Sequence, residues 1–314
     1  MDKNAVIINQ KIVIGISACC MGCPVRYNKK GWDMLEHLGR ERNDFKWCPV
    51  CPESMAGLGV PREPIHTVGS NGAGVWTGEA YVKNRKGEIV TDMLKEGAKV
   101  CMDTLKRAGA VAYVYMEGSP SCGVYRTTLK KQKRGNPPGV FGSILLDNGF
   151  FLIPSADLQS PLKWWDWRRR LLAFTWLKGE EINNKDQLYS TWYRLKFLCQ
   201  EIDNNWSRDM GKKLAKLETK DLEAFSSEFK KDVMNILRIP STTAKIKNRL
   251  WKSYSHFRKT KGKTKGKTIP DINSPEFKRN VTTISKELLK LERTAVEDEI
   301  LLGVSPVIYR DIRR

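Results

Sequence analysis

The sequence predicts two regions of different fold class: an α/β region with a Rossmann-like open sheet over residues 1–157, and a mainly α-helical, basic region over residues 158–314. Three observations lead to this prediction. Short β-branched runs alternate with helical segments in the first half. From about Asp157 onward, long segments place apolar residues at helical spacing instead. The basic residues are concentrated in this second half.

The elements of the first half follow from local patterns. Lys11–Ser17 is apolar and β-branched, as is Ala110–Tyr115, and both are expected to be buried strands. Met93–Ala108 repeats apolar residues at helical spacing, and Gly109 is expected to end that helix. Further elements are expected at 32–42 (a helix), 47–51 (the end of an apolar stretch), 78–90 (a hairpin) and 143–153 (a helical turn and a strand). In open α/β sheets, sites gather at the carboxyl ends of strands, so the loops after these strands are the candidate site.

The second half is expected to be helical. Seven of the ten Trp residues lie here, beside Leu and Phe on one face of each segment and Lys or Arg on the other. Trp at helical spacing is usually part of a core, although the run Trp164–Arg170 can also be read as a nucleic-acid contact. The expected helices are 162–178, 187–206, 221–238, 241–259 and 275–298.

The charge pattern favours a polyanionic partner. Lys and Arg outnumber Asp and Glu by 55 to 35 in the whole chain. Residues 1–157 contain 21 basic and 15 acidic residues, whereas residues 158–314 contain 34 and 20. Aromatic residues spread along the helical segments favour nucleic acid over a membrane surface. No apolar run is long enough to cross a bilayer and no signal-peptide core is visible, so a cytoplasmic protein is expected.

The most basic segment, Arg258–Thr268, contains no apolar residue and two Gly. We expect a mobile linker or loop, and because it has no core interpretation it is the better candidate for phosphate contacts. The predicted contact residues are Arg258, Lys259, Lys261, Lys263, Lys265 and Lys267.

The chain has eight Cys, and five of them lie near the N-terminus. Without a secretory signal, metal or cluster ligation is a better interpretation than a disulfide framework. One interpretation is a structural zinc site made by two C-x2-C pairs 24 residues apart. That site would use Cys20, Cys23, Cys48 and Cys51, and it leaves Cys19 and Cys122 without a role.

A second interpretation takes Cys19, Cys51 and Cys122 together. Each lies in a loop rich in small residues or Pro, where the backbone can approach a bulky inorganic cluster. Three thiolates on a four-iron cluster leave one iron open, which is typical of a chemical rather than a structural site.

Several motifs resemble the thiouracil desulfurase family, and they occur in the family's order over about residues 11–155. Two of these motifs are highly specific when they occur together. One is Cys51-Pro52-Glu53 followed by Gly57–Arg62, and the other is Ser119–Gly123. The supporting motifs are Ile16–Cys19, Val25–Tyr27, Thr91, Gly97-Ala98 and Gly139-Val140.

The resemblance implies a Rossmann-type domain that holds a 4Fe–4S cluster on Cys19, Cys51 and Cys122. It implies replacement of sulfur by oxygen on a thiolated uracil, and relatives act on 4-thiouridine in tRNA. In the implied mechanism the open iron binds the substrate sulfur and water attacks the carbon. Glu53 is the expected proton carrier, with an ion pair to Arg62 or Arg26 as its alternative role. Ser119 and Ser121 are expected to position water or the base, or else to cap the turn.

The sequence also departs from the family pattern. Cys20 replaces an aliphatic residue, Cys48 is additional, and Glu117 brings a negative charge close to Ser119–Gly123. Two other functions therefore stay open beside the desulfidase. One is a nucleic-acid-binding protein with a structural Cys site for zinc or a cluster, and the other is a sulfur-transfer enzyme on the same fold.

Overall fold

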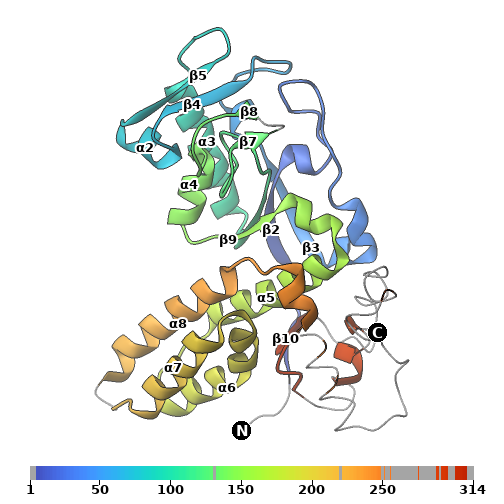
Figure 1. Cartoon of the computed structure of the whole chain (residues 1–314), viewed down its shortest axis with the longest axis vertical. Coiled ribbons are helices and arrows are strands. Elements are labelled where there is room, and N and C mark those ends of the chain that lie inside the picture. Colours follow the sequence, from blue (N-terminus) through green and yellow to red (C-terminus); the bar gives the residue numbers. More distant parts are fainter. Residues whose placement is uncertain are drawn as a thin grey trace. The chain divides into compact units, whose positions relative to one another are not determined.

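The computed structural model describes residues 5–129, 132–218, 221–248, 251, 255, 275, 288–289, 291–295 and 301–309. These residues form two compact units, one over 11–159 and the other over 160–309 together with residues 5–10 (Figure 1). The predicted combination of an α/β region with a parallel sheet and a helical C-terminal region is confirmed. Within the described residues, no helix has the length and apolar character that a membrane crossing requires.

The α/β unit is built on a four-stranded parallel sheet. Its strand order is β3 (Phe45–Val50), β2 (Ile12–Ser17), β6 (Ala112–Tyr115) and β9 (Phe151–Pro154). Both strongly predicted strands, β2 and β6, are neighbours in its centre. Because all four strands run in the same direction, the loops that follow them emerge at one edge of the sheet.

Helices α3 (Thr91–Arg107) and α4 (Val140–Asp147) pack on the sheet and close its main core (Figure 1). The predicted helix over 93–108 is thus confirmed, and it starts two residues earlier. Tyr113 of β6 packs edge to face on Phe141 of α4, with ring centroids 5.4 Å apart. Cys101 of α3 is buried in the same core, and burial raises the pKa of its thiol to about 12.

Shorter elements surround the sheet. The segment predicted as a helix at 32–42 overlaps a 3₁₀ helix, η2 (Glu36–Asp44), which starts four residues later and ends two residues later than predicted. The predicted hairpin at 78–90 is only partly present: the strand β5 (Ala80–Asn84) pairs with β4 (Ile65–Gly69), and a single bridge joins Lys83 to Ile89. The remaining elements are α1 (Pro52–Met55), α2 (Gly72–Thr77), β7 (Thr128–Leu129), β8 (Gln132–Lys133), η1 (Ala18–Cys20) and η3 (Ser155–Gln159).

The second unit is a helical bundle of α5 (Pro161–Gly179), α6 (Lys185–Ile202), α7 (Asn204–Ala215) and α8 (Leu222–Arg238) (Figure 1). A short parallel pair, β1 (Val6–Ile8) with β10 (Val307–Tyr309), joins the two ends of the chain within this unit. The helix predicted over 187–206 is wrong at its end. Asp203 breaks it, and the Asp203 carboxylate caps α7 by accepting a hydrogen bond from the Trp206 N–H at 3.0 Å.

The Trp164–Arg170 run of α5 is part of this core, so its interpretation as a nucleic-acid contact is wrong. Trp164 and Trp167 are buried, and so are the three Arg residues. Arg169 pairs with Asp166 at 2.6 Å and with Glu201 at 2.7 Å, and Arg170 pairs with the second oxygen of Asp166 at 2.5 Å. Burial alone would raise the pKa of Asp166, but the two guanidinium groups outweigh it and hold the pKa below its usual range.

Candidate functional site

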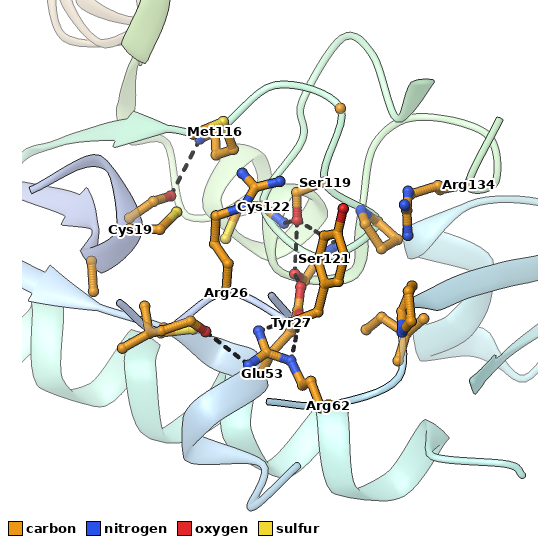
Figure 2. Close-up of a pocket in the computed structure, with 18 of the residues that line it drawn as sticks. Cys19, Arg26, Tyr27, Glu53, Arg62, Met116, Ser119, Ser121, Cys122 and Arg134 are labelled. Atoms are coloured by element: carbon orange, nitrogen blue, oxygen red, sulfur yellow. Dashed lines mark hydrogen bonds and ion pairs between the residues drawn. The ribbon is translucent and has the colours of Figure 1, made fainter. Parts of the chain in front are cut away.

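The three cysteines of the second interpretation line one pocket at the carboxyl edge of the sheet, and Figure 2 shows two of them, Cys19 and Cys122. Cys19 lies in η1 directly after β2, and Cys51 follows β3. Cys122 lies in the turn after β6. The space within the pocket is about 610 Å³, a volume that includes open solvent at its mouth.

The turn that carries Cys122 is locked by its neighbours. The Ser119 hydroxyl oxygen accepts hydrogen bonds from the N–H groups of Ser121 at 3.2 Å and Cys122 at 3.1 Å. The start of α4 presses on the same turn, because a Cβ at Gly139 would lie 2.5 Å from the Pro120 carbonyl oxygen. Only glycine allows this approach, which gives the Gly139-Val140 motif a packing role.

Cys51 is held by a different close approach. A Cβ at Gly97 of α3 would lie 2.3 Å from the Pro52 carbonyl oxygen, so α1 rests directly on the α3 backbone. The Ser54 hydroxyl on α1 donates a hydrogen bond to the Cys51 sulfur at 3.3 Å. Such a donor stabilises a thiolate, and hydrogen bonds to sulfur are a recognised feature of cluster sites.

The electrostatic environment of the three thiols favours a bound cation over three free thiolates. The neighbouring Cys20 thiol and burial raise the pKa of Cys19. Burial, and then the Glu53 charge, raise the pKa of Cys51, against the opposing hydrogen bond from Ser54. Burial raises the pKa of Cys122, and the nearby Cys51 and Cys19 raise it further. Three thiolates in one pocket repel one another, so the deprotonated set needs positive charge such as iron supplies.

The four thiols of the zinc interpretation do not form a comparable group. Cys20 is fully buried, and Cys48 packs against the core beneath α3, whereas Cys51 lines the pocket. Among the described residues, no three His, Cys, Asp or Glu side chains are close enough to bind a single metal ion. A tetrahedral zinc site on Cys20, Cys23, Cys48 and Cys51 is therefore not supported.

Glu53 and the two serines form one hydrogen-bonded chain along the pocket wall (Figure 2). Ser121 donates to Oε1 of Glu53 at 2.6 Å. Because the Ser121 proton is used there, the 3.0 Å contact between the two serine hydroxyls has Ser119 as donor. Arg62 donates to Oε2 of Glu53 from Nη2 at 2.6 Å and from Nε at 2.9 Å. Of the two ion pairs that the sequence allowed for Glu53, the structure contains the one with Arg62.

Two pocket residues lacked a clear signal in the sequence. Arg134 follows β8 and reaches the pocket through the fold, and no local pattern marks it. Glu117, noted only as a departure from the family pattern, also lines the pocket, and burial raises the pKa of its carboxyl. The predicted nucleic-acid contacts Arg258, Lys259, Lys261, Lys263, Lys265 and Lys267 lie outside the described residues.

Comparisons with known proteins place the first half of the chain in a family. Residues 14–157 match the family model described as 2-thiouracil desulfurase. The uncharacterised protein YbbK of Bacillus subtilis (strain 168) is 31% identical over 153 residues, covering 48% of this chain and 100% of YbbK. A solved structure of the 4Fe–4S-dependent thiouracil desulfidase TudS is 27% identical, covers 48% of this chain and 93% of that chain, and superposes with a TM-score of 0.38. The resemblance seen in the motifs is thus confirmed, and the chain belongs to the 2-thiouracil desulfurase family.

Proposed function

We propose that this protein is a desulfidase that removes sulfur from a thiolated uracil or uridine, within tRNA, using a 4Fe–4S cluster held by Cys19, Cys51 and Cys122. One observation carries the proposal. Three thiols from three strand ends line the same pocket as a carboxylate–serine chain that can move protons. Family membership supports the substrate class, since the matching family is described by its action on 2-thiouracil.

The donor set fits a cluster. Thiolates are the usual ligands of iron–sulfur clusters, and Ser54 already donates to one of the three sulfurs. The small-residue and proline loops around Cys51 and Cys122 leave the backbone close to the pocket. When bound, such a cluster has one iron without a protein ligand, and that iron can act as a Lewis acid toward the substrate sulfur.

The protein's own residues supply the proton chemistry in this proposal. The net change is C=S plus water giving C=O plus H₂S, so the attacking water must lose both of its protons, one after the other, and the departing sulfur must gain two. A water that gives its proton to Ser121 lets Ser121 pass its own proton to Oε1 of Glu53. Arg62 holds the other oxygen of Glu53 by two hydrogen bonds and so fixes the direction of Oε1. Ser119 donates a hydrogen bond to the Ser121 hydroxyl, and its own oxygen accepts one from the Cys122 N–H, which fixes the turn.

The tRNA part of the proposal rests on charge. The whole chain carries a formal charge of +20, and the segment predicted to contact RNA is its most basic stretch. Lys and Arg neutralise phosphates without sequence preference. In this proposal they supply affinity for the RNA backbone, and the pocket recognises the thiolated base. A base inside folded RNA has to be unstacked to reach such a pocket.

Turnover measurements test the proposal. Protein purified without oxygen is incubated with 4-thiouracil and, separately, with tRNA that contains 4-thiouridine, and released sulfide is measured. We expect sulfide from both, and none from Cys122→Ala. No sulfide from either substrate, with the cluster present, would refute the desulfidase proposal. Neutralising the six basic residues of Arg258–Lys267 is expected to raise KM for tRNA in a salt-dependent way and to leave 4-thiouracil turnover unchanged.

A further inference from the structure

Four side chains, three of which line the pocket, alternate between aromatic rings and guanidinium groups. In order they are Trp32, Arg26, Tyr27 and Arg134, called here the cation–aromatic row. The Arg26 guanidinium lies 4.3 Å from the centre of the Trp32 ring and 5.7 Å from that of Tyr27. The Arg134 guanidinium lies 5.4 Å from the Tyr27 ring centre. Figure 2 shows Tyr27 between the two arginines.

The two arginines of the row have unused binding capacity. Among the residues that the structure describes, neither guanidinium makes an ion pair or a hydrogen bond, and the Nε of each is buried without a partner. The third arginine of the pocket, Arg62, differs because it is paired with Glu53. Buried donors without partners are costly, so Arg26 and Arg134 are suited to a ligand with oxygen acceptors.

The outer end of the row reaches beyond the pocket. Trp32 is 42% exposed and does not line the pocket itself. Its backbone N–H donates to the Cys19 carbonyl oxygen at 2.7 Å, so it is anchored beside the loop of a candidate cluster ligand. Because Trp32 is not among the residues that line the pocket, a base bound only in the pocket would not contact it. A ligand that uses Trp32 must therefore continue outside the pocket.

We propose that the cation–aromatic row is a binding strip for the single-stranded RNA that flanks the thiolated base, with Trp32 stacking on an adjacent base. Alternating flat rings and cations match the alternating bases and phosphates of an unpaired strand. The assignment of the pocket itself to a thiolated base rests on the proposed function. The strip would let the catalytic unit prefer a thiolated base within RNA over the free base.

The test compares Trp32→Ala and Trp32→Phe with the unchanged full-length protein. Affinity for a labelled single-stranded RNA oligonucleotide is measured by fluorescence anisotropy, and kcat/KM is measured on 4-thiouridine tRNA and on free 4-thiouracil. We expect Trp32→Ala to weaken oligonucleotide binding and to lower kcat/KM on tRNA, each on the order of 10-fold. Turnover of 4-thiouracil should not change, and Trp32→Phe should restore most of the loss. Tyr81→Ala is the matched control, because Tyr81 is 40% exposed on β5 and does not line the pocket.

Several results would contradict the proposal that the cation–aromatic row binds single-stranded RNA. They are an unchanged oligonucleotide affinity for Trp32→Ala, an equal loss on tRNA and free base, and an equal loss of affinity for fully double-stranded RNA. If the unchanged protein releases no sulfide from any substrate, the proposed function fails, but the oligonucleotide measurement still decides whether the row binds RNA.

Discussion

Gly97 offers the sharpest test of how the fold positions Cys51. In Gly97→Ala the new Cβ would lie 2.3 Å from the Pro52 carbonyl oxygen and 2.5 Å from the Ala56 nitrogen. Both contacts are to backbone atoms, so no change of rotamer can relieve them. Helix α1 must move away from α3, and Cys51 and Glu53 must move with it.

The magnitude follows from two opposing effects. Alanine is a better helix former than glycine by about 0.8–1.0 kcal/mol. Overpacking a core costs about 1–3 kcal/mol, and a backbone contact that cannot rotate away belongs at the upper end or above. The expected result is a loss of about 2 kcal/mol in the free energy of unfolding of the α/β unit. Gly211→Ala in α7 is the matched control, because a Cβ there meets nothing within 4 Å, and it should gain about 0.5–1 kcal/mol.

Urea unfolding of the two variants measures both effects. Because the chain has two compact units, amide hydrogen exchange of α3 and α7 assigns each change to its unit. Gly97→Ala should also bind less iron per chain than the unchanged protein, whereas Gly211→Ala should bind the same amount. An unchanged or increased stability of Gly97→Ala would refute the close approach of α1 to α3.

Three further predictions concern individual side chains. Glu53→Gln should keep its cluster spectrum but lower kcat for sulfide release by about 10²–10⁴-fold, and an unchanged kcat would exclude Glu53 as the proton carrier. Asp166→Ala should destabilise the helical unit by about 3–5 kcal/mol in denaturant unfolding, because it leaves two buried guanidinium groups without their shared partner; a loss below 1 kcal/mol would contradict this. The pKa of Cys101 is raised from 9.0 to about 12, so between these pH values the folded state keeps a proton that the unfolded state has lost. Titration of this thiol should therefore lower the free energy of unfolding by about 1.4 kcal/mol per pH unit in this range. In Cys101→Ala the free energy of unfolding should fall less steeply with pH, and identical slopes in the two proteins would show that Cys101 does not contribute.

The sequence predicted the parts of the fold and site that have local causes. The β-branched runs at Lys11–Ser17 and Ala110–Tyr115 contain the two central strands, and the amphipathic run at 93–108 is α3. Cys19 and Cys122 follow predicted strands, and parallel strands end on the same side of a sheet. The sequence therefore predicted that both cysteines lie at one edge of the sheet, where the pocket is found.

The features that the sequence did not predict depend on contacts between distant segments. The pairing of β1 with β10 joins residues about 300 positions apart, and Arg134 reaches the pocket from the segment after β8. No local pattern shows that β1 pairs with β10 or that Arg134 lines the pocket, because both depend on the whole fold.

The burial of Arg169 and Arg170 was missed for a related reason. Three consecutive arginines normally indicate an exposed face, and their acidic partners are split between α5 itself and Glu201 of α6. The break between α6 and α7 was missed because the apolar spacing continues across Asp203, and the side-chain cap outweighs that spacing.

Metal analysis of the full chain, purified without oxygen, tests the central claim most directly. The cluster on Cys19, Cys51 and Cys122 predicts iron and acid-labile sulfide near four each per chain, with a broad brown absorption band. Cys122→Ala should lose both the iron and the band, whereas Cys23→Ala should keep them. One zinc per chain in a colourless solution, or full iron retention in Cys122→Ala, would contradict the assignment of the three cysteines.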